Sequence, residues 1–107
     1  MLLDQGADVN AQGENYDNAL YTASAKGYKK IVTLLLDKGA DVNAQGGTYG
    51  NALQAASTQG HKEIVTLLLD KGADVNAQGG TYGNALQAAL AEGYKEIVML
   101  LLDQGAD

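Results

Sequence analysis

The chain has 107 residues, with 7 basic side chains (all lysine) and 13 acidic ones, which gives a formal net charge of −6. This length has room for one small domain, and the negative charge would repel nucleic acid and anionic membrane surfaces. Cysteine is absent, so disulfides, thiolate metal sites and a thiol nucleophile are excluded.

No targeting or membrane-spanning segment is visible in the sequence. The N-terminal stretch MLLDQGADVN has no basic region followed by an apolar run, as a signal peptide would. No unbroken apolar run approaches the roughly 20 residues needed to cross a bilayer. We therefore expect an intracellular protein, and the cytoplasm is the compartment that these features fit.

The sequence repeats itself every 33 residues. The string GADVNAQG begins at Gly6, Gly39 and Gly72, and a last GAD begins at Gly105. An internal period of this length is typical of a repeat array. Identity between the copies is high, with 25 of 33 positions shared by the second and third units, which indicates recent duplication or consensus design.

The period divides the single domain, residues 1–107, into one fragment and three larger units. They are a partial repeat (1–14), two repeats (15–47 and 48–80) and a nearly complete repeat (81–107).

Each unit is predicted to fold as two short helices and a loop. Asn51 is a suitable N-cap, and Gln54 follows three residues later as in a capping box; Asn84 and Gln87 repeat this arrangement. Gly60 stands where a left-handed residue would end the first helix.

The second helix of the unit is predicted from Lys62 to about Asp70. It is apolar over most of its circumference, so it needs neighbours on both sides. Residues 73–82 form a polar, glycine-rich connection that is predicted to project as a hairpin. Helices of eight or nine residues are marginal alone in water, so stacking of the units must stabilise them.

Two motifs resemble those of the ankyrin repeat family: G-H-K-E-I-V-x-L-L-L at residues 60–69 and G-A-D-V-N-A at residues 72–77. The resemblance covers essentially the whole chain. It implies an all-α, ankyrin-repeat solenoid of helix-turn-helix units joined by hairpin loops. The N-A-L-Q-A-A variant is similar to near-identical ankyrin arrays of filamentous-fungal proteins, often at the C-terminus of NLR-like receptors.

One departure from the family pattern affects the loop. The usual T-P-L-H is replaced by N-A-L-Q at residues 51–54. Asparagine caps a helix as threonine does, but the histidine that ties helix to hairpin in the family is missing. This change predicts a less firmly held loop.

No catalytic or cofactor-binding residue is predicted. His61 is the only histidine, and Tyr28 and Tyr94 take its position in the sister repeats. In the family this residue bonds to nearby backbone. Ser57 lies near His61 in sequence, but no buried aspartate or nucleophile elbow accompanies it. We expect a protein that is not an enzyme.

Two loop motifs are interpreted as turns. The pairs Gly46-Gly47 and Gly79-Gly80 are followed by no Gly-Lys-Ser/Thr element that would bind phosphate. The segment Asp41-Val42-Asn43 offers oxygens that could suit calcium, but it lacks the spacing of an EF-hand loop. We predict no metal site and no cofactor.

The resemblance implies binding of another protein on the hairpin tips and on the concave face of the first helices. The matching residues, repeat by repeat, are Tyr16, Asp17, Ala25 and Lys26; Thr48, Tyr49, Thr58 and Gln59; Thr81, Tyr82, Ala91 and Glu92. One tyrosine per repeat at the tips would give a large contact area at low entropic cost. The alternative is that each ring packs on its own hairpin.

The ends of the array raise a second hypothesis. Leu2 and Leu3 are the stub of a missing helix, and in the last repeat Leu90 and Met99 replace serine and threonine. Exposed apolar patches favour association. The alternative function is therefore a self-assembling structural protein that stacks end to end into a homo-oligomer. Excision from a longer array would also explain apolar ends.

Overall fold

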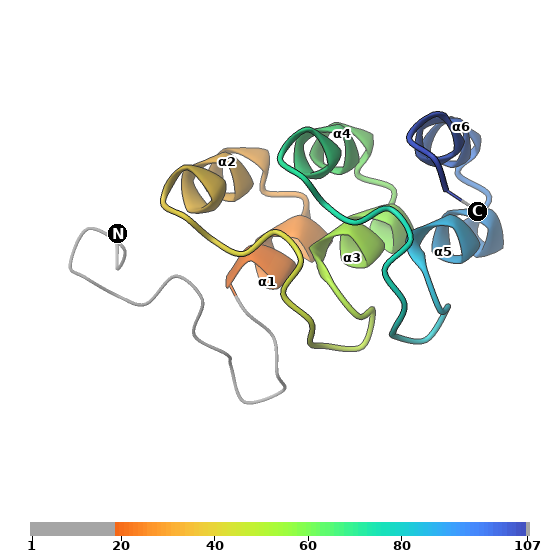
Figure 1. Ribbon diagram of the computed structural model, residues 1–107, viewed down its shortest axis with the longest axis horizontal. Helices are drawn as coiled ribbons and strands as arrows, with labels where there is room; N and C mark the ends of the chain where they lie inside the picture. Colours follow the sequence, from red (N-terminus) through yellow and green to blue (C-terminus); the bar gives the residue numbers. More distant parts are fainter. Residues whose placement is uncertain (1–18, 107) are drawn as a thin grey trace.

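The computed structural model describes residues 19–106, and the described chain is all-α, as the sequence predicts. The helices alternate between two layers: α1, α3 and α5 form an inner layer, and α2, α4 and α6 form an outer one (Figure 1). Hairpin loops connect successive pairs and project from the inner layer (Figure 1). The helices are α1 (Ala19–Lys26), α2 (Lys29–Asp37), α3 (Ala52–Gln59), α4 (Lys62–Asp70), α5 (Ala85–Glu92) and α6 (Lys95–Asp103).

The inner helices begin and end at the residues that the sequence singled out. The Asn51 side chain accepts from the backbone N–H of Gln54, and Asn84 does the same for Gln87, both at 2.8 Å. Gly60 ends α3 in the left-handed conformation, with φ of 77°. The predicted caps are therefore confirmed, because each satisfies backbone groups that a helix terminus leaves unpaired.

The core lies between the two layers and between neighbouring repeats. Small side chains on α3 are almost completely buried, which lets α1 and α5 pack closely on either side of it. On α4, Val65 and Leu68 are buried, while Lys62, Thr66 and Asp70 face solvent as predicted. The pair α3–α4 is therefore covered on both sides, by α1–α2 and by α5–α6, as its composition requires.

The glycines that end α1 and α3 are also contact points for the next repeat. A Cβ atom on Gly27 would lie 2.7 Å from the His61 ring, and one on Gly60 would lie 2.8 Å from the Tyr94 ring. His61 Nε2 also lies 3.1 Å from the carbonyl oxygen of Ala25, in the preceding repeat. The bond of His61 to backbone, which the family resemblance implies, is thus present and ties two repeats together.

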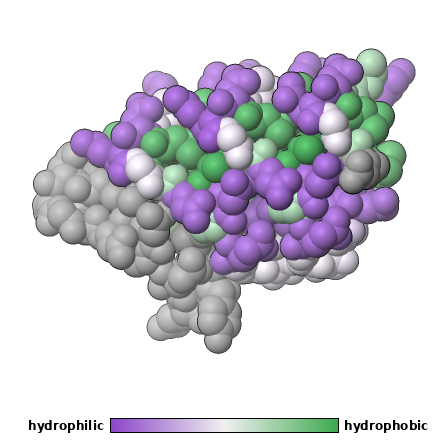
Figure 2. Space-filling view, in the orientation of Figure 1, coloured by the Kyte–Doolittle hydropathy of each residue, from purple (hydrophilic) through white to green (hydrophobic). Residues whose placement is uncertain are grey.

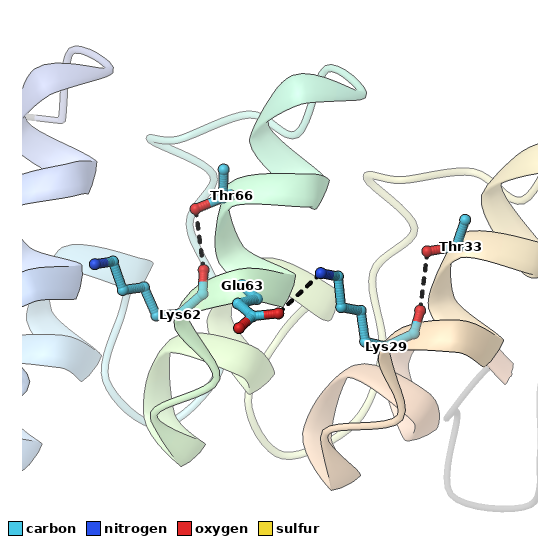
Figure 3. A network of polar contacts seen from close by, with 5 residues as sticks. All are labelled: Lys29, Thr33, Lys62, Glu63 and Thr66. Atoms are coloured by element: carbon cyan, nitrogen blue, oxygen red, sulfur yellow. Dashed lines mark hydrogen bonds and ion pairs between the residues drawn. The ribbon is translucent and has the colours of Figure 1, made fainter.

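Ion pairs link successive outer helices on the solvent side. Figure 3 shows the pair formed by Lys29 and Glu63. Lys29 Nζ lies 2.8 Å from Glu63 Oε2, and Lys62 Nζ lies 2.6 Å from Glu96 Oε2. The hydrogen bond and charge of each lysine lower the pKa of the glutamate that it contacts. All four side chains are more than half exposed, so these pairs add little to stability and mainly favour the stacking register.

The hairpin is held by Gln54, which corrects the expectation of a loose loop. Its side-chain amide donates to the carbonyl oxygen of Gly79 in the next hairpin at 2.7 Å. Tyr21 has the same position in its repeat, and its hydroxyl accepts from the backbone N–H of Tyr49 at 2.8 Å. Glutamine and tyrosine thus replace the missing histidine. Gln54 therefore uses its side chain to hold the hairpin after α4 and not in a capping box.

Neighbouring hairpins also touch through their backbones. Gly79 and Gly83 form an isolated antiparallel bridge, which confirms the predicted hairpin between α4 and α5. Thr81 N donates to the carbonyl oxygen of Thr48 at 3.1 Å. A Cβ atom on Gly80 would lie only 2.4 Å from the carbonyl carbon of Tyr49, so a side chain has no room there.

We predict that Gly80→Ala destabilises the protein far more than Gly83→Ala. Both glycines have positive φ, so both alanines carry the strain of a left-handed residue, about 1–2 kcal/mol. A Cβ on Gly83 meets nothing within 4 Å, whereas one on Gly80 meets the neighbouring backbone. Urea unfolding should therefore show an additional loss of roughly 2 kcal/mol for Gly80→Ala, within the range for overpacking. Equal losses in the two variants would contradict the hairpin contact.

We predict that Gln54→Ala destabilises the protein by about 1–2 kcal/mol, because the variant removes a buried side chain and leaves the part-buried carbonyl of Gly79 without its donor. The matched control is Gln87→Ala. Gln87 has the same position in the last repeat, but its side chain is exposed and makes no described hydrogen bond, so its removal should change stability by less than about 0.5 kcal/mol. Urea unfolding measures both losses. Amide hydrogen exchange should show faster opening near Gly79 in Gln54→Ala alone.

Candidate functional site

Three positions of the repeat change at every step along the array. They are the only positions that differ both between residues 15–47 and 48–80 and between residues 48–74 and 81–107. In the middle repeat they are Thr58, Gln59 and His61. All three lie at the C-terminal end of an inner helix or in the turn after it. The variation is thus concentrated at one place on an otherwise constant frame.

The three variable positions have different surroundings. The ring at the His61 position contacts the preceding repeat, so it belongs to the stacking interface. Thr58 was predicted to lie on the binding face, but its side chain is only 6% exposed and its hydroxyl donates to the Gln54 carbonyl. At the same position, Ala25 is half-buried and Ala91 is exposed. The small side chains at this position do not protrude from the helix.

The remaining variable position is exposed in every described repeat. It is the last residue of each inner helix: Lys26 in α1, Gln59 in α3 and Glu92 in α5. All three side chains are exposed. The position therefore changes from positive through neutral to negative along the array.

The tip tyrosines lie back against these helix ends. Tyr49 and Tyr82 are both half-buried. Gln59 Nε2 donates to the Tyr49 hydroxyl at 3.0 Å, and the Tyr82 hydroxyl donates to Glu92 at 3.0 Å. The Tyr49 ring also stacks on Tyr21 of the preceding repeat, with centroids 6.4 Å apart. Each ring is therefore fixed in place while one part of it remains accessible.

Two predicted tip residues join adjacent hairpins. Thr48 and Thr81 are exposed, and both the backbone N–H and the hydroxyl of Thr81 bond to the Thr48 carbonyl. The other predicted tip residues, Tyr16 and Asp17, lie outside the described residues. We call the accessible set formed by helix ends and tip rings the variable row; its members are Lys26, Tyr49, Gln59, Tyr82 and Glu92.

The side chains considered for catalysis or metal binding have structural partners or are buried. Ser57 is completely buried, so its hydroxyl is not accessible to a substrate. The Asp41 carboxylate accepts from the backbone N–H of Asn43 at 3.0 Å, which is the geometry of an Asx turn. Residues 19–106 contain no group of three His, Asp or Glu side chains arranged to hold a metal ion, and no helix among them is long and apolar enough to cross a membrane.

The last described repeat carries exposed apolar side chains. Leu90 and Met99, which the sequence singled out, are 52% and 55% exposed, and Leu102 is 51% exposed. The sequence alone could not single out Leu102, because leucine also occupies this position in the two preceding repeats. Those leucines, Leu36 and Leu69, are half-buried. Leu2 and Leu3 lie outside the described residues. Apolar groups also form a band across the face in Figure 2, between polar side chains of the outer helices and the loops.

The contact between Tyr82 and Glu92 predicts a measurable pKa shift. The hydrogen bond and the charge of Glu92 raise the pKa of Tyr82 above its ordinary value. The pKa of Tyr82 is therefore higher in the folded than in the unfolded state. The stabilisation from this contact is fully present below the ordinary tyrosine pKa and is lost as pH rises through the raised value. We expect Glu92→Gln to return the pKa of Tyr82 toward its ordinary value. A pH titration monitored by NMR of the tyrosine ring carbons measures this pKa.

The control for that titration is Glu96→Gln, which removes the same charge from the side chain that pairs with Lys62. It should leave the pKa of Tyr82 raised. If the pKa of Tyr82 is the same in the wild type and in Glu92→Gln, the tip ring does not lie against the end of α5.

The comparison with known families agrees with this architecture. No curated protein is detectably similar to the chain in sequence. A family model described as "Ankyrin repeats (3 copies)" matches residues 1–79 and, in a second overlapping match, residues 48–107. These matches span the stacked helix pairs, the glycine-terminated inner helices and the hairpins described above. The chain therefore belongs to the ankyrin repeat family.

Proposed function

We propose that this chain is a non-enzymatic protein-binding module whose partner docks on the variable row. Ankyrin repeats are generally modules for protein–protein interaction. The observation that carries the proposal is the location of the variation: the residues that change at every repeat and remain accessible are the ends of the inner helices. A constant core with variable side chains at one exposed position suits recognition of a specific partner.

The construction of the row supports binding at low entropic cost. Tyr49 and Tyr82 are already fixed by hydrogen bonds to Gln59 and Glu92, so little side-chain freedom remains to be lost on association. Tyrosine is also enriched among residues that dominate interface energies. The row therefore combines rigid aromatic surface with polar groups that vary from repeat to repeat.

The test begins by identifying a protein that contacts the variable row. A photo-crosslinking residue is placed at position 59, and in a second protein at Lys71, which is exposed in the turn after α4. Each protein is irradiated in an extract of the source cells. A partner that crosslinks from position 59 and not from position 71 is then purified for binding measurements.

With that partner we expect Tyr49→Ala and Tyr82→Ala to weaken binding by roughly tenfold or more, the size typical of interface hot spots. Lys71→Ala should leave the affinity unchanged. Calorimetry measures the affinities, and circular dichroism checks that each variant is folded. The proposal fails if the tyrosine variants bind as tightly as the wild type.

A second candidate function is self-assembly through the apolar end. It is supported by the half-exposed Leu90, since the equivalent Ser57 of the preceding repeat is completely buried, and by the half-exposed Leu102, whose equivalent Leu69 is less exposed. A second copy that covered this surface would remove apolar area from water, which favours association.

Light scattering coupled to size exclusion tests this candidate over a wide range of concentrations. If the end associates, the mass should rise above the 11.1 kDa of one chain as concentration increases, and Leu90→Glu should restore that mass. Tyr49→Ala should leave the assembly intact. A constant mass of 11.1 kDa at every concentration would exclude this candidate.

A further inference from the structure

We propose that the variable row binds an extended peptide segment with opposite charges at its two ends, an acidic residue facing Lys26 and a basic residue facing Glu92. The inference rests on the proposed function and specifies the chemistry of the partner. It follows from the order of the side chains along the row, from the surroundings of the two charges and from the distance between them.

The residues that set the order of the charges occupy equivalent positions in successive repeats. Lys26, Gln59 and Glu92 are each the last residue of an inner helix, and the three helices pack side by side as α1 on α3 and α3 on α5. All three side chains are exposed. The three inner helices stand in a row (Figure 1). Their last residues therefore follow one another along the array as a positive, a neutral and a negative side chain.

The negative end is not explained by the needs of the fold. The C-terminal end of a helix carries a partial negative charge, which favours a lysine such as Lys26 and disfavours a glutamate such as Glu92. Among residues 19–106, Glu92 has no ion-pair partner, and its described polar contact is the Tyr82 hydroxyl. A cation supplied by a ligand would complement both the carboxylate and the helix terminus.

The middle of the row is neutral and suited to hydrogen bonding. The Tyr49 hydroxyl accepts from Gln59, so its own hydrogen is available to a ligand, and the side-chain oxygen of Gln59 is available as an acceptor. The adjoining variable position holds only small residues, Ala25, Thr58 and Ala91. A low, polar surface of this kind suits an extended backbone, which presents donors and acceptors at regular intervals.

The length of the row fixes the spacing of the two charges on the peptide. Packed helices lie about 8–10 Å apart, so the two steps from α1 to α5 cover roughly 16–20 Å. An extended chain advances about 3.3 Å per residue, which places the acidic and basic residues about five or six positions apart. A single loop that touches one repeat could not meet both charges.

The experiment selects random peptides of about 12 residues, displayed on phage, against the intact chain. Three proteins are compared: the wild type, Lys26→Glu and Glu92→Lys. Two matched controls make the same charge changes away from the row, at positions exposed near the ends of the outer helices: Lys38→Glu and Asp70→Lys. Competition with Tyr49→Ala as a second bait removes peptides that bind elsewhere on the surface.

We expect the wild type to enrich peptides with one acidic and one basic residue at the stated spacing. Lys26→Glu should enrich peptides with basic residues at both ends, and Glu92→Lys peptides with acidic residues at both ends. Each reversal should weaken a wild-type peptide about three- to tenfold, as for exposed ion pairs. Lys38→Glu and Asp70→Lys should select and bind the same peptides as the wild type.

The outcomes separate this inference from the proposed function. The charge-ordered ligand would be overturned if peptides that need Tyr49 showed no charge pattern. It would also be overturned if their charge pattern stayed the same in Lys26→Glu and Glu92→Lys. In both cases the row would remain a protein-binding face. Enrichment of no peptide that needs Tyr49 would overturn the extended ligand altogether. A partner crosslinked at position 59 would in that case bind through a folded surface, and the proposed function would stand.

Discussion

The array depends on the contact between one inner helix and the next. No helix in residues 19–106 has more than nine residues, so none would be stable alone in water. Small side chains on α3 allow α1 and α5 to pack against it, and this packing sets where the hairpins and the outer helices lie. The ring of His61 or Tyr94 on the preceding glycine and the amide of Gln54 on the following hairpin then fix the spacing between repeats. The helix ends follow one another in a row because this contact is repeated.

Recognition and stability are assigned to neighbouring positions of the same short segment. At the end of α3, Thr58 is buried, Gln59 is exposed and His61 bonds to the preceding repeat. All three positions vary between repeats, but only the middle one is free to vary without disturbing the stacking. A sequence comparison that counts variation alone would therefore overstate the binding face by including its structural neighbours.

Most of the fold could be predicted from local patterns, whereas the ties between repeats could not. Asn51 and Gly60 act through the backbone of their own helix, so their roles were visible in the sequence. The partner of the Gln54 side chain lies 25 residues away, and local spacing favoured a capping box instead. Likewise, the identity of Thr58 does not reveal that it is buried. Lys26, Gln59 and Glu92 were expected on the binding face from the family resemblance, and all three are exposed in the structure.

The contacts between repeats join residues that are about one period apart. Lys62 meets Glu96 across 34 positions, and Thr81 meets Thr48 across 33. Duplicating the unit 48–80 would therefore reproduce every such contact at the new junction without altering the old ones. Each added copy would lengthen the edge of the inner layer by one helix end and one tip tyrosine. Adding whole units thus lengthens the ligand that the surface can span, while the packing contacts of each repeat remain the same.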